Sequence, residues 1–314
     1  MKTSTPVRVG NRSRRRAGTV LRTGLGTVLA LAAASLVSVL VPLHWVDDTV
    51  LSREGFTRVV GTLADDRPFQ EELARTAVDR AADVVLGERT GLPFLDRILE
   101  DAARRAGDLA AGLTADPAYQ RAWTQTLVRT HEANVPAPGE TPPANLVVDL
   151  RPLLDELDGA VERAVGFDIG LSERQGVVTV PGTGTGRLIE TWIRLTDLAV
   201  PLTWAAAALA GLALVVTRHR FATLAVLGLG SLVGLGVVGE LVERGVRRVT
   251  GLLGPDPVVR LVVDRVTDLL LGSLGEQMLT AAWVAGATGV VGVLGAVVAA
   301  VVSAGSRRRH RPTA

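Results

Sequence analysis

The chain has 314 residues, of which 47% are hydrophobic and 21% are charged, so apolar and charged residues must be segregated along it. It contains no cysteine, which excludes disulfides, thiolate metal sites and a cysteine nucleophile. The net charge is only +2, and the basic residues flank apolar runs instead of forming a nucleic-acid-binding surface.

The chain begins with a basic segment and an apolar run. Residues 1–46 hold seven basic residues and no acid, and residues 23–46 contain no Asp, Glu, Lys or Arg. Those 24 residues can cross a hydrocarbon core of ~30 Å at roughly 1.5 Å per residue. A cleaved signal peptide is the alternative, but the run is longer than such peptides have. We expect a cytoplasmic tail over residues 1–22 and a first span over 23–46.

Residues 47–197 form the longest polar segment, with 16 arginines against 26 acidic residues. Helical periodicity dominates its first two-thirds, and Asp116-Pro117 is typical of a helix start. We expect an extracytoplasmic domain that is mostly helical, with a small β element. The expected helices lie near residues 52–63, 67–87, 92–113, 117–132 and 152–165, and the expected strands lie at 145–150 and 176–180.

The last third of the chain alternates between apolar runs and charged segments. It predicts a helical hairpin with a basic tip, then an amphipathic helical loop, a last span and a basic tail. The expected segments are span two at 198–217, a cytoplasmic turn at 218–220, span three at 221–239, an extracytoplasmic loop at 240–276, span four at 277–303 and a cytoplasmic tail at 304–314.

These segments predict a mainly α, four-span membrane protein with both termini in the cytoplasm of a cell membrane. The amino-terminal tail, the 218–220 turn and the carboxy-terminal tail are all strongly basic, and the positive-inside rule places such segments in the cytoplasm. Four crossings satisfy all three. The tryptophans Trp45, Trp192, Trp204 and Trp283 lie near the ends of spans on the opposite side, as interfacial tryptophans do.

The chain contains a weak internal repeat. Residues 71–87 read EELARTAVDRAADVVLG, and residues 256–272 read DPVVRLVVDRVTDLLLG. Acid, Arg, Asp and Asp recur four apart in both copies, which predicts a polar stripe along one side of an otherwise apolar helix. We therefore interpret the chain as two related halves.

The two stripes are the only candidate interaction site that the sequence offers. They could face each other and form one site, or each could be a solvated helix face with weak i,i+4 ion pairs. The apolar residues beside the second stripe need a cover, from either the outer domain or the lipid interface. The candidate residues are Arg75, Asp79, Arg80, Asp83, Arg260, Asp264, Arg265 and Asp268.

No stretch carries recognisable catalytic, metal or cofactor chemistry. The glycine-rich residues 181–186 lack the Lys-Ser/Thr of a phosphate-binding loop and predict a connector. His131 has no histidine at metal-ligand spacing, so we expect it to pack or to bond at a helix end. Spans two to four lack titratable residues, which disfavours a pump, and Gly230-x-x-x-Gly234 favours close helix packing within the chain. The sequence indicates no enzyme class and no cofactor.

Three loose motifs carry a resemblance. They are Asp66-Arg-Pro-Phe-Gln, then Asp116-Pro-Ala-Tyr with Trp123 and His131, and Val147-Val-Asp-Leu-Arg-Pro-Leu-Leu. With the layout of spans, they resemble a group of actinobacterial multi-pass membrane proteins of unknown function over most of residues 20–305. The resemblance implies a cell-envelope setting and no particular activity.

Two functions fit these features. The first is a non-enzymatic membrane protein whose outer helical domain binds another envelope protein, because the acidic domain lacks catalytic groups. The alternative is a permease-like or lipid-handling protein, since duplicated membrane halves often enclose a path. Expected partners are the bilayer, with anionic lipids at the basic termini, and an envelope protein; no nucleic acid is expected, and the sequence does not indicate an oligomeric state.

Overall fold

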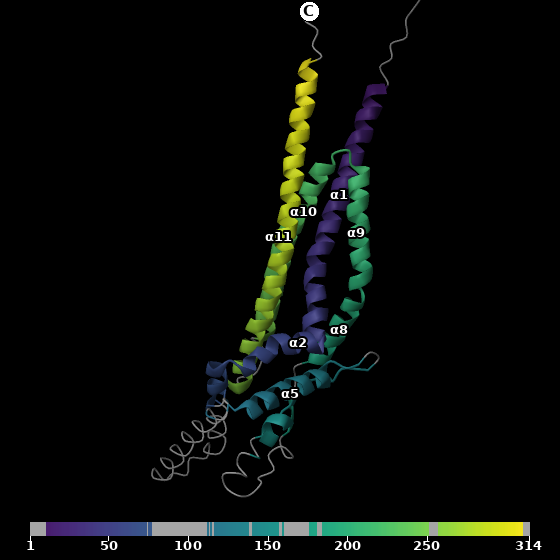
Figure 1. Ribbon diagram of the computed structural model, residues 1–314. Helices are drawn as coiled ribbons and strands as arrows, with labels where there is room; N and C mark the ends of the chain where they lie inside the picture. The colour runs from purple at the N-terminus through teal and green to yellow at the C-terminus, as the bar shows by residue number, and fades with distance from the viewer. Residues whose placement is uncertain are drawn as a thin grey trace, which may run out of the picture. The chain divides into compact units, whose positions relative to one another are not determined.

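In the computed structural model the chain is mostly helical (Figure 1). It divides into two units. Unit 1 comprises residues 1–44, 197–242 and 275–314, and unit 2 comprises residues 45–196 and 243–274. The structure describes residues 11–73, 75–76, 112, 114, 116–137, 140–156, 159, 176–180, 184–250 and 257–309.

Among the residues that the structure describes, four helices are long and apolar enough to cross a membrane, which confirms a multi-pass membrane protein as far as length and composition define one. Each has at least the roughly 18–20 residues that ~30 Å of hydrocarbon requires. They are α1 (Asn11–Trp45), α9 (Ala199–Val216), α10 (Arg220–Thr250) and α11 (Pro257–Arg309).

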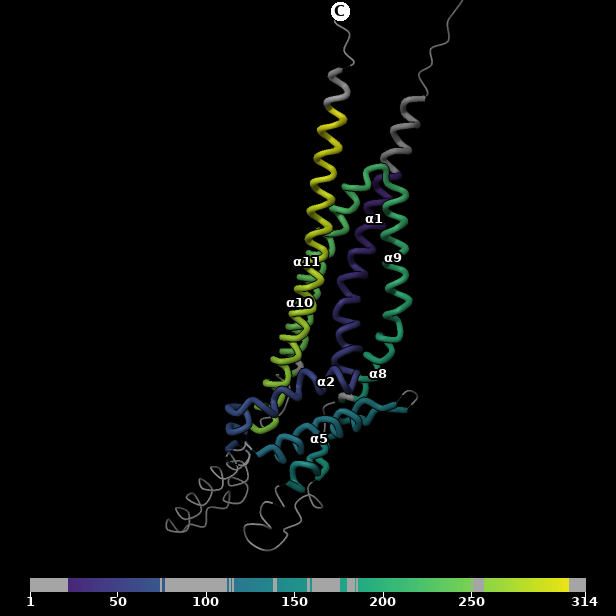
Figure 2. The backbone as a smooth tube through the Cα atoms, viewed as in Figure 1, coloured from purple at the N-terminus to yellow at the C-terminus, as the bar shows by residue number. Residues whose placement is uncertain are grey.

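Within unit 1, three chain segments that are far apart in sequence lie at the same end. Figure 1 shows the amino-terminal end of α1, the turn between α9 and α10, and the carboxy-terminal end of α11 at the top of the view. Figure 2 shows the same course of the four helices as a tube. This arrangement brings the basic turn at 218–220 to the end at which α11 leaves the apolar run.

Small residues let the helices of unit 1 approach closely. A Cβ added to Gly228 on α10 would overlap the backbone of Gly289 on α11, and one added to Gly234 would overlap Ser38 on α1. The Ser38 hydroxyl donates to the carbonyl oxygens of Ala34 (2.9 Å) and Ser231 (3.3 Å). The glycines therefore serve packing within the chain, as the sequence predicts.

The helices run past two of the predicted span ends. α10 continues to Thr250, and α11 begins at Pro257 and runs without interruption into the apolar run, whereas the division into units at 242–243 and 274–275 lies close to the predicted segment 240–276. No proline lies inside either helix, and the glycines there cost only about 1 kcal/mol each relative to alanine. A change from polar to apolar residues therefore does not end a helix.

Unit 2 combines short helices with a pair of antiparallel strands. Among the described residues its elements include a π-helical turn Val46–Leu51, α2 (Arg53–Val60), a 3-10 turn Gly61–Ala64, α5 (Pro117–Asn134), β1 (Leu146–Asp149), β2 (Val177–Val180) and α8 (Thr185–Asp197). The strands pair antiparallel with Leu146 opposite Val180, which confirms the predicted β element. The predicted start of α5 is also confirmed, since the Asp116 carboxylate accepts from Ala118 N at 2.8 Å.

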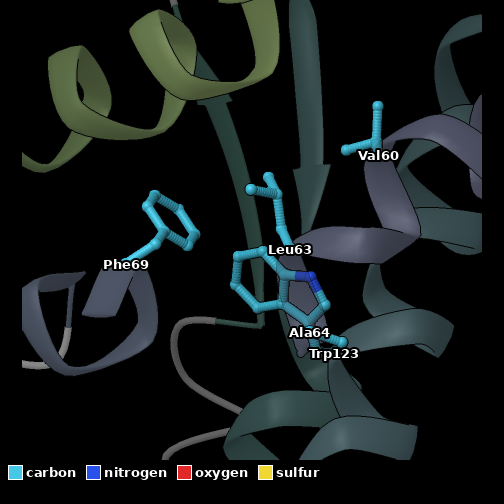
Figure 3. Packing of buried hydrophobic residues seen from close by; sticks show 5 residues of the cluster. All are labelled: Val60, Leu63, Ala64, Phe69 and Trp123. Carbon is cyan, nitrogen blue, oxygen red and sulfur yellow. The ribbon is translucent and has the colours of Figure 1, made fainter. Parts of the chain in front are cut away.

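The core of unit 2 brings together residues from both polar segments of the chain (Figure 3). Phe69 and Trp123 meet edge to face with ring centroids 6.1 Å apart, a geometry worth about 0.5–1.5 kcal/mol beyond burial. From the helix α11, five half-buried residues pack against the same cluster, so unit 2 covers the apolar side of the second repeat copy. These residues are Leu261, Val262, Val266, Leu269 and Leu270.

Candidate interaction site

The first two of the three sequence motifs are joined by a buried hydrogen-bond network around Gln70. The Gln70 side chain is 1% exposed; its Nε2 donates to the Leu63 carbonyl at 2.7 Å, and its Oε1 accepts from the Tyr119 hydroxyl at 3.0 Å. Burial raises the pKa of Tyr119 to about 12, so the hydroxyl keeps its proton at neutral pH. The first two motifs therefore meet in space and hold the 3-10 turn against α5.

The third motif, which contains β1, is hydrogen-bonded to α5. Asn134 donates to the Thr130 and Val147 carbonyls, both at 2.6 Å, and its Oδ1 accepts from Val147 N at 2.9 Å. Asp149 N donates to the Thr130 hydroxyl at 3.0 Å. Side chains of α5 therefore satisfy the backbone groups along one edge of β1, which a third strand would otherwise pair.

Asp149 is a buried carboxylate, 5% exposed, that is held by Arg151. It accepts from Arg151 N at 3.1 Å and Nε at 2.9 Å, and it forms an ion pair with the same guanidinium. The hydrogen bonds from Arg151 outweigh burial and lower the pKa of Asp149 below its ordinary value. The group is therefore ionised at neutral pH and serves the fold.

Of the predicted stripe, Arg265 makes the clearest contact. It forms an ion pair with Asp66, whose other oxygen accepts from Phe69 N at 3.2 Å and so caps the helix that begins the first repeat copy. The Arg265 hydrogen bond lowers the pKa of Asp66. One residue of the second stripe thus touches the segment just before the first copy.

The remaining stripe residues form no shared polar site among the parts that the structure describes. Arg75 lies 3.8 Å from Glu71, an i,i+4 pair on its own helix, and Arg260, Asp264 and Asp268 are exposed. The predicted residues Asp79, Arg80 and Asp83 lie outside the described residues. The structure does bring apolar residues of the two predicted copies together, because Leu73 packs on the same core as five residues of α11.

His131 packs in the core, as expected from the sequence. It is 7% exposed; its ring lies 5.0 Å from that of Phe56, and its Nε2 lies 3.0 Å from the Val50 carbonyl oxygen. Trp45 differs from the expectation of an interfacial side chain. It is 7% exposed, and its Nε1 donates to the Ser273 hydroxyl at 3.3 Å, so it ties the end of α1 to α11 within unit 2.

The surface of unit 2 carries one polar groove that the sequence analysis missed. It lies between the 3-10 turn and α5 and has a volume of about 550 Å³. Asp65 and Arg121 place opposite charges along it, and both are exposed. Its lining residues are Gly61, Ala64, Asp65, Pro117, Gln120, Arg121, Thr124 and Gln125.

The groove carries side chains that can bind a partner through hydrogen bonds and charge. Its side chains are amides, a hydroxyl, one carboxylate and one guanidinium, without a histidine or a second carboxylate for general acid–base work. Across the residues that the structure describes, no three His, Asp or Glu side chains converge as metal ligands would. Three lining residues, Pro117, Arg121 and Gln125, lie four apart and therefore share one side of α5, which the sequence could have indicated. The opposite wall comes from a distant segment and depends on the tertiary fold.

Comparison of the chain with protein-family models, with curated proteins and with solved structures finds no match. The assignment of a function therefore depends on the geometry of the chain itself.

Proposed function

We propose that the protein is an integral membrane protein that presents unit 2 outside the cytoplasm as a docking domain for another protein of the cell envelope. The observation that carries the proposal is the polar groove between the 3-10 turn and α5. It is open, carries both signs of charge, and rests on a core whose hydrogen bonds through Gln70 and Asn134 hold both of its walls.

The extracytoplasmic side follows from the distribution of charge. The residues 1–46, 198–239 and 277–314 contain no acid, and their basic residues cluster at the tails and at the 218–220 turn. The positive-inside rule assigns such segments to the cytoplasm, which leaves the acidic residues 47–197 outside. A net charge of −10 on that segment favours a partner with a basic surface.

The packing of unit 1 argues against the permease-like alternative. Gly228 brings α10 against the backbone of α11, and Gly234 lets the Ser38 side chain of α1 pack against α10. The Ser38 and Thr217 hydroxyls, which are buried there, already donate to carbonyls. Transport paths for ions normally contain a titratable residue that faces the bundle interior. The spans over 198–217, 221–239 and 277–303 have none in their sequence.

The test is photo-cross-linking in living cells from the groove. A photoreactive residue at Gln125, which lines the groove and is exposed, should recover one protein reproducibly. The matched control is Ala133, exposed on the same helix and ~12 Å farther along its axis, which should not recover it. Reversal of charge in Arg121→Glu should abolish the cross-link. Adducts only within the chain or to lipid would contradict the proposal.

A further inference from the structure

Unit 1 carries an apolar groove between α10 and α11. It has a volume of about 710 Å³, within the range of ligand sites. Phe221 forms one wall, and its ring lies so close to Gly295 that a Cβ there would overlap it. The lining residues are Phe221, Val291, Leu294, Gly295, Val298, Ala299, Val302 and Ser303.

The groove is shorter than the hydrocarbon core of a bilayer. Its lining runs along α11 from Val291 to Ser303, which is ~18 Å at 1.5 Å per residue. Half of a ~30 Å hydrocarbon core is ~15 Å. A spanning helix of a protein partner would need the full thickness, whereas a lipid acyl chain needs only one leaflet. The groove therefore fits an acyl chain better than a helix.

A basic turn lies beside the groove. Arg220 directly precedes Phe221, and Arg218 and His219 are exposed beside it. Arg307–Arg309 lie farther along α11, since Phe221 meets that helix at Gly295, eight residues before Ser303. The segments 198–239 and 277–314, which contain both walls, have no acidic residue, so neither can neutralise these charges.

We propose that this groove binds the acyl chain of an anionic phospholipid, whose headgroup phosphate is bound by Arg218 and Arg220. Arginine donates several hydrogen bonds to phosphate in a fixed fork, and each basic residue near an anionic membrane surface contributes about 1 kcal/mol. The inference requires only the spanning helices of unit 1 and does not depend on the docking function of unit 2. Cross-linking from Gln125 and lipid binding here can fail separately.

The test is native mass spectrometry of the full chain, purified in a neutral detergent and titrated with phosphatidylglycerol or phosphatidylcholine of identical acyl chains. The wild-type protein should retain the anionic lipid at least tenfold more tightly. The variant Arg218→Gln with Arg220→Gln should lose roughly fivefold per arginine, about 25-fold in all. The control variant Arg58→Gln with Arg187→Gln makes the same change in net charge at exposed residues of unit 2 and should bind as the wild type does.

A second pair of variants tests the groove itself. Ala299→Phe fills it and should weaken binding of the anionic lipid, whereas Val297→Phe, on an exposed residue of the same helix outside the lining, should not. Equal affinity of the wild type for the two lipids would overturn the proposal. So would a preference that persists in the double arginine variant, or an Ala299→Phe protein that binds like the wild type.

Discussion

Gln70 is the residue on which the packing of the 3-10 turn against α5 depends. Replacement Gln70→Ala removes the acceptor of the Tyr119 hydroxyl and one donor to the Leu63 carbonyl, which also accepts from Asp66 N at 3.3 Å. We expect the free energy of unfolding of unit 2 to fall by about 1–3 kcal/mol, the cost of leaving a buried polar group without a hydrogen-bond partner. Thermal unfolding of the detergent-solubilised protein, followed by tryptophan fluorescence, measures this. Gln125→Ala, at an exposed position, is the control, and an equal loss in both variants would contradict the role of Gln70.

Asp149 and Asp66 make the stability of unit 2 depend on pH. The pKa of each carboxyl is lowered in the folded chain by hydrogen bonds from an arginine. Each group therefore contributes stability above the unfolded pKa of about 3.9, and this contribution is lost as the pH falls through the lower folded value. Thermal midpoints of the wild type and Asp149→Asn should converge below pH ~4. A constant difference from pH 7 to pH 3 would contradict the prediction.

At the scale of the element, α10 offers a matched pair of glycines. Gly228 meets the backbone of α11, whereas Gly236 has open space where its Cβ would be. Gly228→Ala should push the helices apart and destabilise the bundle by about 1–3 kcal/mol, the usual cost of overpacking. Gly236→Ala should be neutral or stabilise by up to about 1 kcal/mol, because alanine has the higher helix propensity. The measurement is the denaturant resistance of the two proteins, and equal behaviour would contradict the packing seen here.

Elements with a strong local signal were predictable from sequence. The apolar runs define the spans, Asp116-Pro117 defines the start of α5, and β-branched residues define β1 and β2. The continuity of α11 was not predictable from hydropathy, since a helix can pass from a polar to an apolar environment without a change in backbone geometry. Trp45 shows the same limit, because its partner Ser273 is 228 positions away in sequence.

The candidate site was less predictable than the fold. A polar stripe on a helix is equally compatible with solvent and with a partner, and only Arg265 of the described stripe residues makes a contact distant in sequence. The groove between the 3-10 turn and α5 joins residues 61–65 to residues 117–125. The sequence of each segment is that of an ordinary amphipathic helix. The contacts of Gln70, Phe69 and Trp123 bring the two segments together.

At the scale of the whole molecule, the proposed docking function depends on which side of the membrane unit 2 occupies. The chain has no native cysteine, so a single introduced cysteine is a unique label. The most direct measurement is the reaction of a membrane-impermeant maleimide with Gln125→Cys and with His219→Cys, both at exposed positions. We expect labelling of Gln125→Cys in intact cells and labelling of His219→Cys only after lysis. The reverse pattern would place unit 2 in the cytoplasm and contradict the proposed docking function.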